Sequence, residues 1–248
     1  MGAKTVCELY KEGNCTKEEA EKALPLCSNP GIGFTVAGVG ETLLGSTSVG
    51  VKLWLSCLVS SLAVSILKSR KHTVKSRELP QKTTKEPQKL TQLRTATETV
   101  IESVSESAAS MLKVCGFVVI FKTVSAVFLE ITASLPLFHQ VSSPAFSALT
   151  TCVFEFSSGI FNLTQAVSDQ LTLCLPFTYP VPLLHLLTAT TLAWSGISVH
   201  MQTTAFASSN NLTLKTYYPQ KLLSAVLTPL CFILLSYIET AMKHCKFF

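Results

Sequence analysis

The sequence predicts an all-α membrane protein, a polytopic helix bundle that contains broken or re-entrant helices. Of its 248 residues, 48% are hydrophobic and 14% are charged, and the mean hydropathy of +0.40 is too high for an ordinary soluble domain of this length. The apolar run from Val49 to Leu67 would span roughly 28 Å as a helix, which is enough to cross the hydrocarbon of a bilayer. Glycine, proline and polar residues interrupt several other apolar runs, which predicts the breaks.

The clearest interruption is the stretch from Trp194 to Gln202, which contains two serines, a glycine and a histidine. A helix broken within the membrane exposes N–H groups that attract anions and carbonyl groups that attract cations. Because lipid offers these groups no partner, the break should face protein or a water-lined cavity. We therefore interpret this stretch as a solute site, and the alternative is a helix end at the membrane interface followed by a polar loop.

The N-terminal part predicts a small soluble unit followed by a second break. Residues 5–23 read as a helix-turn-helix that we expect to be cytoplasmic, with Thr16 as the N-cap of its second helix and Glu19 three residues later. The stretch from Asn29 to Gly33 then interrupts the next apolar segment, because Pro30 lacks an N–H and the glycines permit irregular backbone.

A basic segment divides the chain. Residues 68–94 carry nine lysines and arginines against two glutamates, together with two prolines and few aliphatic side chains, so they predict a flexible cytoplasmic linker. This gives two membrane regions, residues 1–67 with two membrane segments and residues 95–248 with about four. Six crossings would place the linker and the basic C-terminal tail on the same side, but a re-entrant hairpin over residues 183–207 would change that parity.

Ionisable residues inside apolar stretches are candidates for ion coupling or for structural roles. Lys122 and Glu130 lie eight residues apart on roughly one side of a helix, so we expect both to face the protein interior, with snorkelling to the interfaces as the alternative. Glu155, with Ser158 and Gly159 close by, is a stronger candidate because the adjacent backbone can also supply ligands. The stripe of Glu98, Glu102 and Glu106 is interpreted as a solvated or cavity-facing surface.

Other classes of function find little support in the sequence. The nine cysteines form no C-x-x-C pair and mostly lie in apolar segments, so we predict neither a metal site nor a disulfide framework. We expect no cofactor and no enzymatic activity, because no nucleophile–base pair and no phosphate-binding loop is recognisable. The net charge of +5 comes mainly from the linker, so it does not indicate binding to nucleic acid.

Several short motifs together point to a family. They are Met1–Lys4, Cys7–Tyr10, Cys27–Gly31, Ser110–Phe121, Leu129–Thr132, Ser195–Gln202 and Lys221–Leu223. Over nearly its whole length the chain resembles the family of the sporulation integral membrane protein YlbJ, also called SpoVV. That family has a further membrane region and a Gly-Tyr-Pro ahead of the Gly-Ala-Lys found here at residues 2–4, so we expect this chain to be N-terminally truncated or its start to be misassigned. The family more often has Gly-Gly or Phe-Gly where this chain has Trp194 to Ile197.

The resemblance implies a fold and a function. It implies two gate regions similar to parts of concentrative nucleoside transporters, with residues 1–67 ending the first and residues 95–248 forming the second. It further implies transport of dipicolinic acid, a small dianion, across the outer forespore membrane of a bacterium that forms endospores. Partners would be the anionic solute, membrane lipid and, for assembly, a second copy or other sporulation membrane proteins. The alternatives are a non-transporting assembly protein of that membrane, which would dock through the N-terminal unit and the linker, and a nucleoside carrier.

On this reading, backbone N–H groups at the two breaks take the solute carboxylates, and nearby polar side chains orient the solute. Glutamates cannot attract a dianion, so they would carry a proton or a sodium ion, or hold a helix in place. The predicted solute-binding residues are Asn29, Gly31, Ser195, Gly196, Ser198, His200 and Gln202, and the predicted ion-coupling or structural residues are Glu130, Glu155 and Ser158.

Overall fold

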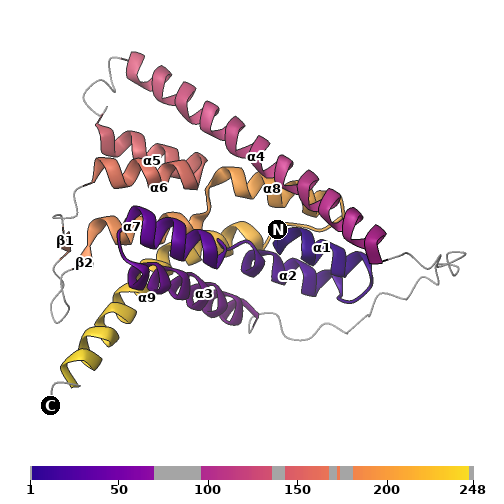
Figure 1. The fold of residues 1–248 in the computed structure, drawn as a ribbon, viewed down its shortest axis with the longest axis horizontal. Helices are drawn as coiled ribbons and strands as arrows, with labels where there is room; N and C mark the ends of the chain where they lie inside the picture. The colour runs from indigo at the N-terminus through magenta and orange to yellow at the C-terminus, as the bar shows by residue number, and fades with distance from the viewer. Residues whose placement is uncertain (1, 70–95, 136–142, 168–171, 174–180, 246–248) are drawn as a thin grey trace, which may run out of the picture.

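The computed structural model describes residues 2–69, 96–135, 143–167, 172–173 and 181–245 (Figure 1). Helices make up nearly all of this, with one pair of two-residue strands in antiparallel register, Thr172 opposite Pro182 and Leu173 opposite Val181. In chain order the elements are α1 (Gly2–Lys11), α2 (Lys17–Cys27), the π-helix η1 (Gly33–Leu43), α3 (Thr47–Ser69), α4 (Ala96–Ser134), α5 (Pro144–Phe154), α6 (Phe156–Ala166), β1 (Thr172–Leu173), β2 (Val181–Pro182), α7 (Leu183–Trp194), α8 (Gly196–Ser208) and α9 (Tyr217–Cys245).

Three of the described helices are long and apolar enough to cross a membrane. They are the segments Thr47–Lys68 of α3, Val100–Ser134 of α4 and Tyr217–Lys243 of α9, and α5 is a shorter apolar helix. Many large apolar side chains on α3, α4 and α9 are exposed, which is the pattern expected where lipid covers a helix. The all-α class and the membrane character predicted from composition are thus supported in this general form.

The N-terminal unit forms the predicted helix pair. Thr16 accepts a hydrogen bond from the Glu19 N–H at 3.2 Å, and the Glu19 carboxylate accepts one from the Thr16 N–H at 2.9 Å, so the capping box is confirmed. The apolar face of the pair packs against α8 and the start of α9, in a cluster that includes Cys7, Leu24 and Ala207. Burial there raises the pKa of the Cys7 thiol. The apolar face of this unit is therefore buried by contacts with other helices of the same chain.

Helices α3 and α9 pack antiparallel along the centre of the bundle. Near the start of α3, the Lys52 ammonium lies 2.8 Å from the Glu239 carboxylate near the end of α9. Further along, the hydroxyl oxygens of Ser60 and Thr228 are 2.6 Å apart. The end of α3 that leads into the linker and the C-terminal end of α9 therefore lie at opposite ends of the bundle (Figure 1). If both helices cross the membrane, the linker and the tail would lie on opposite sides of it, so the expectation that they share one side stays an untested prediction.

The stretch from Pro144 to Leu163 is a hairpin of two short helices rather than one span. The chain turns back at Glu155, which ends α5 and caps α6. The two helices come close enough that a side chain at Gly159 would collide with the backbone of Cys152. By contrast, α7 and α8 do not fold back on each other, so the alternative of a re-entrant hairpin over residues 183–207 is not what the structure has. The number of membrane crossings stays a prediction.

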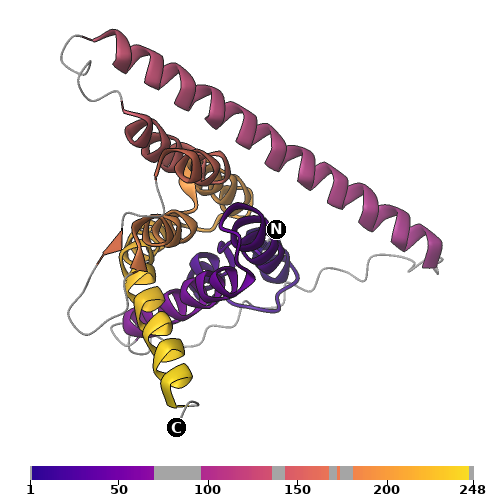
Figure 2. The same ribbon diagram turned by 60° about the vertical axis from the view of Figure 1, so that its left-hand side comes forward.

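Helix α4 stands largely apart from the rest of the bundle (Figure 2). Its 39 residues would measure about 58 Å, well beyond the roughly 30 Å of hydrocarbon in a bilayer. Near its N-terminal end, Glu106 lies 3.5 Å from the Lys4 ammonium of α1. Lys122 and Glu130 are both exposed, so the expectation that they face the protein interior is wrong. The reason is that, among the described residues, α4 packs mainly on α5 and α8, which leaves most of its surface uncovered.

The two predicted regions pack into one bundle. The main core cluster combines Val39 and Leu53 from the first region with Ile160, Leu192 and Phe232 from the second. Residues 70–95, which contain nearly all of the predicted linker, lie outside the described residues. The division into gate repeats therefore stays a prediction, while the packing shows that residues on both sides of the linker share a core.

Candidate solute site at the helix breaks

The first break separates α7 from α8. Ser195 has φ +68° and Gly196 has φ +74°, so two consecutive residues adopt the left-handed conformation. The Ser195 N–H still bonds to the Thr191 carbonyl at 2.8 Å, which completes α7, but the Ser195 side chain makes no capping bond to the start of α8. A side chain at Gly196 would lie 3.0 Å from the Phe156 nitrogen and 3.2 Å from the Phe154 carbonyl oxygen. Glycine is therefore favoured here both by the left-handed backbone conformation and by this close approach.

The second break follows α2. The helix ends at Cys27, and the Ser28 hydroxyl donates to the Leu24 carbonyl at 2.6 Å. Pro30 cannot donate a backbone hydrogen bond, which removes one of the groups that would continue the helix. Ser28 is buried and Asn29 is half-buried, whereas Gly31 is exposed. Only the beginning of this break therefore faces the interior, and it presents carbonyl groups at the C-terminal end of α2.

Lys221, near the start of α9, joins the two breaks. Its ammonium group donates to the Ser28 carbonyl at 3.3 Å, to the Asn29 side-chain oxygen at 3.2 Å and to the Ser195 hydroxyl oxygen at 3.2 Å. An ammonium has three N–H donors, so these three bonds use all of them. Residues more than a hundred positions apart in the sequence thus meet at one nitrogen atom.

The charge of Lys221 is buried without an anionic partner among the described residues. The residue is 1% exposed, and the groups that accept its hydrogen bonds are a carbonyl, an amide oxygen and a hydroxyl, all uncharged. Buried charges in proteins are usually paired, because removing an ion from water costs several kcal/mol. An uncompensated positive charge at a break in the fold favours the binding of an anion nearby.

Glu155 is a buried carboxylate at the tip of the α5–α6 hairpin. It is 0% exposed, and its carboxylate accepts bonds from the Ser157 N–H at 3.1 Å, the Ser158 N–H at 2.7 Å and the Ser157 hydroxyl. These are the first N–H groups of α6, so the carboxylate satisfies their hydrogen bonds, and its negative charge interacts favourably with the positive end of the helix dipole. The sequence predicts either ion coupling or a structural role for Glu155 and Ser158, and this geometry matches the structural role of holding a helix in place. The tip lies against Gly196 of the first break.

The remaining polar residues of α8 bond to their neighbours. Gln202 donates to the Ser198 hydroxyl at 3.3 Å, and Ser198 is fully buried. His200 Nδ1 lies 3.0 Å from the Tyr217 hydroxyl, and the His200 ring packs edge-on to Trp194 with the ring centres 4.5 Å apart. His200 Nε2 is buried and has no hydrogen-bond partner among the described residues. These bonds form two separate groups along α8, Gln202 with Ser198 and His200 with Tyr217.

The structure thus unites part of the predicted site. Asn29 and Ser195 meet at Lys221, and Gly196 meets the hairpin tip at Glu155. Ser198, His200 and Gln202 follow within α8, whereas Gly31 is exposed at the far side of its break. Lys221 was not predicted as a site residue, because a lysine at the start of an apolar run reads as a snorkelling side chain.

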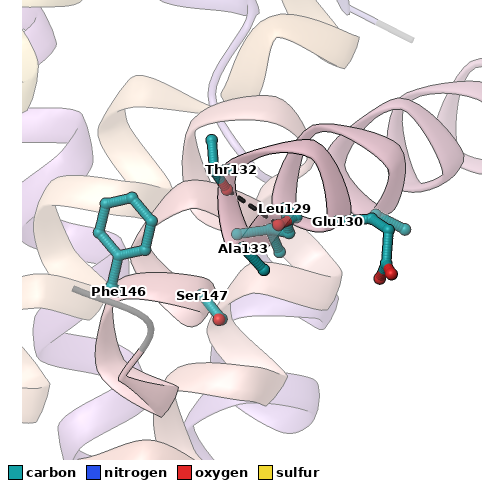
Figure 3. A pocket seen from close by; sticks show the side chains of 7 residues that line it. Leu129, Glu130, Thr132, Ala133, Phe146 and Ser147 are labelled. Carbon is teal, nitrogen blue, oxygen red and sulfur yellow. Dashed lines mark hydrogen bonds between the residues drawn. The ribbon is translucent and has the colours of Figure 1, made fainter. Parts of the chain in front are cut away.

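Glu130 lies elsewhere. It lines a pocket of about 350 Å³ between α4 and α5, together with Leu129, Thr132, Phe146 and Ser147 among others. Its carboxylate points away from Phe146 and Ser147, which lie across the pocket from it (Figure 3). The two glutamates that the sequence placed in one class therefore have different surroundings.

Comparisons of the chain with models of protein families, with curated proteins and with solved structures find no match. Within the part of the chain that the structure describes, no group of three or more histidine, cysteine or acidic side chains is arranged to hold a metal ion. Seven described cysteines are free; three of them, Cys7, Cys57 and Cys152, are buried, while Cys27 and Cys115 are exposed.

Proposed function

We propose that the chain forms the solute-binding part of a membrane carrier for a small anion that carries carboxylate groups. The observation that carries this proposal is the buried Lys221 ammonium, which is held by uncharged oxygens at the meeting point of two helix breaks. Long apolar helices combined with broken helices are the arrangement that secondary transporters use to build sites within a bilayer.

The start of α8 adds to the attraction for an anion. The first N–H groups of a helix carry a partial positive charge, and the side chain of the N-cap residue, Ser195, does not cap them here. Ser195 is directly before them and also contacts Lys221, so the ammonium and the start of α8 are neighbours. In the proposed mode, one solute carboxylate lies near Lys221 and the other near the N–H groups of Gly196 to Ser198. Two separate positive features suit a dianion better than a neutral nucleoside.

The resemblance to the YlbJ, or SpoVV, family supplies the candidate solute. In this proposal the solute is dipicolinic acid, a planar dianion, and the membrane is the outer forespore membrane. Both charged groups of such a solute would find a partner in the mode above. The alternative of an assembly protein that docks through its N-terminal unit is less favoured, because α1 and α2 bury their apolar face against α8.

Dipicolinate binding and flux test the proposal. The purified chain would be incorporated into liposomes, and uptake of labelled dipicolinate measured for the wild type and for Lys221→Ala. Uptake by the wild type that falls at least tenfold in Lys221→Ala supports the proposal. The matched control is Lys122→Ala, which removes an exposed lysine of α4 and should leave uptake unchanged.

Two outcomes would contradict the proposal. If wild-type liposomes show no more dipicolinate uptake than empty liposomes, the transport assignment is wrong. If uridine displaces dipicolinate at equal or lower concentration, the site belongs to a nucleoside carrier. A thermal shift of the detergent-solubilised protein on adding dipicolinate gives a measure of binding that does not depend on reconstitution.

A further inference from the structure

We infer that the oxygen atoms of the two helix breaks form a site for a monovalent cation, and that the Lys221 ammonium fills this site as a tethered substitute for a metal ion. The consequence for transport, that the carrier needs no external sodium or potassium ion, rests on the proposed function. The binding site itself does not, because it can be tested without any solute.

The three atoms around the ammonium are of the kind that bind hard cations. They are the main-chain oxygen of Ser28, the amide oxygen of Asn29 and the hydroxyl oxygen of Ser195. Carbonyl and hydroxyl oxygens are preferred by hard metal ions over nitrogen or sulfur ligands. The Ser28 carbonyl also lies at the C-terminal end of α2, where the helix dipole is negative. Broken transport helices coordinate cations with such carbonyl ends.

Neighbouring hydrogen bonds orient two of these oxygens toward the centre of the site. The Asn29 side-chain nitrogen donates to the Ser61 hydroxyl at 2.8 Å, which leaves the Asn29 oxygen to face Lys221. The Ser195 hydroxyl donates its hydrogen to the Leu192 carbonyl at 3.0 Å, so its lone pairs are free to face the ammonium. The site is therefore preorganised for a positive charge, whichever group carries it.

Side-chain volume decides whether a free ion can replace the ammonium. In Lys221→Ala the charge is lost and the space of the long side chain is vacated, so an alkali ion with bound water can approach the three oxygens. In Lys221→Met the charge is also lost, but an unbranched apolar chain of similar length fills the space. The two variants share the loss of charge and differ in room for an ion.

The test is thermal unfolding of the full 248-residue chain in detergent, without solute, in potassium, sodium or choline chloride at equal ionic strength. For Lys221→Ala we expect potassium or sodium to raise the unfolding temperature by about 5–10 °C over choline, when the ion is about 100-fold above its Kd. Wild type and Lys221→Met should show no difference between the three salts. Adding Asn29→Ala to Lys221→Ala should remove most of the ion-specific shift.

Several results would overturn the inference. A wild-type protein that is stabilised specifically by potassium or sodium would show that Lys221 does not fill the site. A folded Lys221→Ala that unfolds at the same temperature in all three salts would show that the oxygens do not bind an ion. If Lys221→Ala folds in potassium or sodium chloride but not in choline chloride, the inference holds, and failure to fold in every salt contradicts it. A wild type without dipicolinate transport would remove the proposed function and leave these results standing.

Discussion

Replacing Glu155 by glutamine tests how the hairpin tip is held. The wild-type carboxylate accepts two backbone N–H bonds at the start of α6 and the Ser157 hydroxyl bond, and the side chain is fully buried. Glutamine keeps the shape but offers one acceptor oxygen, so one of the N–H groups of Ser157 and Ser158 would face an NH₂ group. Losing a charge-assisted bond and leaving a buried donor unsatisfied would cost about 2–3 kcal/mol.

This cost translates into a measurable shift. For a chain of this size, about 2–3 kcal/mol lowers the unfolding temperature by roughly 5–10 °C. The assay is thermal unfolding in detergent, followed by circular dichroism at matched pH. The control is Glu130→Gln, because that carboxylate is exposed on α4, and its loss should change the unfolding free energy by less than about 0.5 kcal/mol. If the two variants unfold at the same temperature, Glu155 does not cap α6 as described.

Three further predictions follow from the packing. Gly196→Ala should lower the unfolding free energy by at least about 1–2 kcal/mol, because Gly196 has a left-handed backbone conformation. Gly116→Ala should raise the unfolding free energy slightly, because Gly116 lies inside α4 and an added methyl group there would have no neighbour within 4 Å. Thermal unfolding of the two variants checks both expectations. A double-mutant cycle of Ser60→Ala and Thr228→Val should give a coupling energy of about 0.6 kcal/mol in detergent unfolding, and zero coupling would contradict the α3–α9 contact. In oriented vesicles, protease should reach a tag in residues 68–94 and a C-terminal tag from opposite sides, and access from the same side would refute antiparallel α3 and α9.

Local features of the fold were predictable where they depend on neighbouring residues. The capping box at Thr16 and Glu19 and the break at Ser195 and Gly196 both follow from chemistry within a few positions of the chain. The same is true of the interruption at Glu155, although the sequence did not reveal that the chain reverses there. A carboxylate followed by two serines fits a helix start as well as an ion site, and the geometry of the hairpin decides between them.

Long-range packing was beyond prediction. Lys221 lies 193 positions from Ser28, whose carbonyl it contacts, and the spacing of residues in the sequence does not predict that contact. Likewise, the C-terminal half of α4, from Leu112, is apolar almost all round, so the sequence could not tell which side carries Lys122 and Glu130 relative to the bundle. Counting positive charges to orient the tail assumes that every apolar run is one crossing, which the α5–α6 hairpin does not satisfy.

The two buried charges lie on either side of the same break, and this predicts a second property of Glu155→Gln. Ser195 contacts the Lys221 ammonium, and the next residue, Gly196, lies against the backbone at Glu155. The negative charge of Glu155 would repel an anion bound near Lys221. Two unit charges on the order of 10 Å apart repel by about 1–2 kcal/mol at an effective dielectric constant near 20.

Glu155→Gln removes that repulsion, so it should bind dipicolinate about tenfold more tightly than the wild type while being less stable. Titration calorimetry of the folded variant and of wild type, below the unfolding temperature of both, separates the two effects. Because repulsion that acts through protein is only weakly screened, the gain should persist as salt is raised. An unchanged or weaker affinity would show that the anion lies away from the hairpin tip, which would remove α8 as the second contact in the proposed mode.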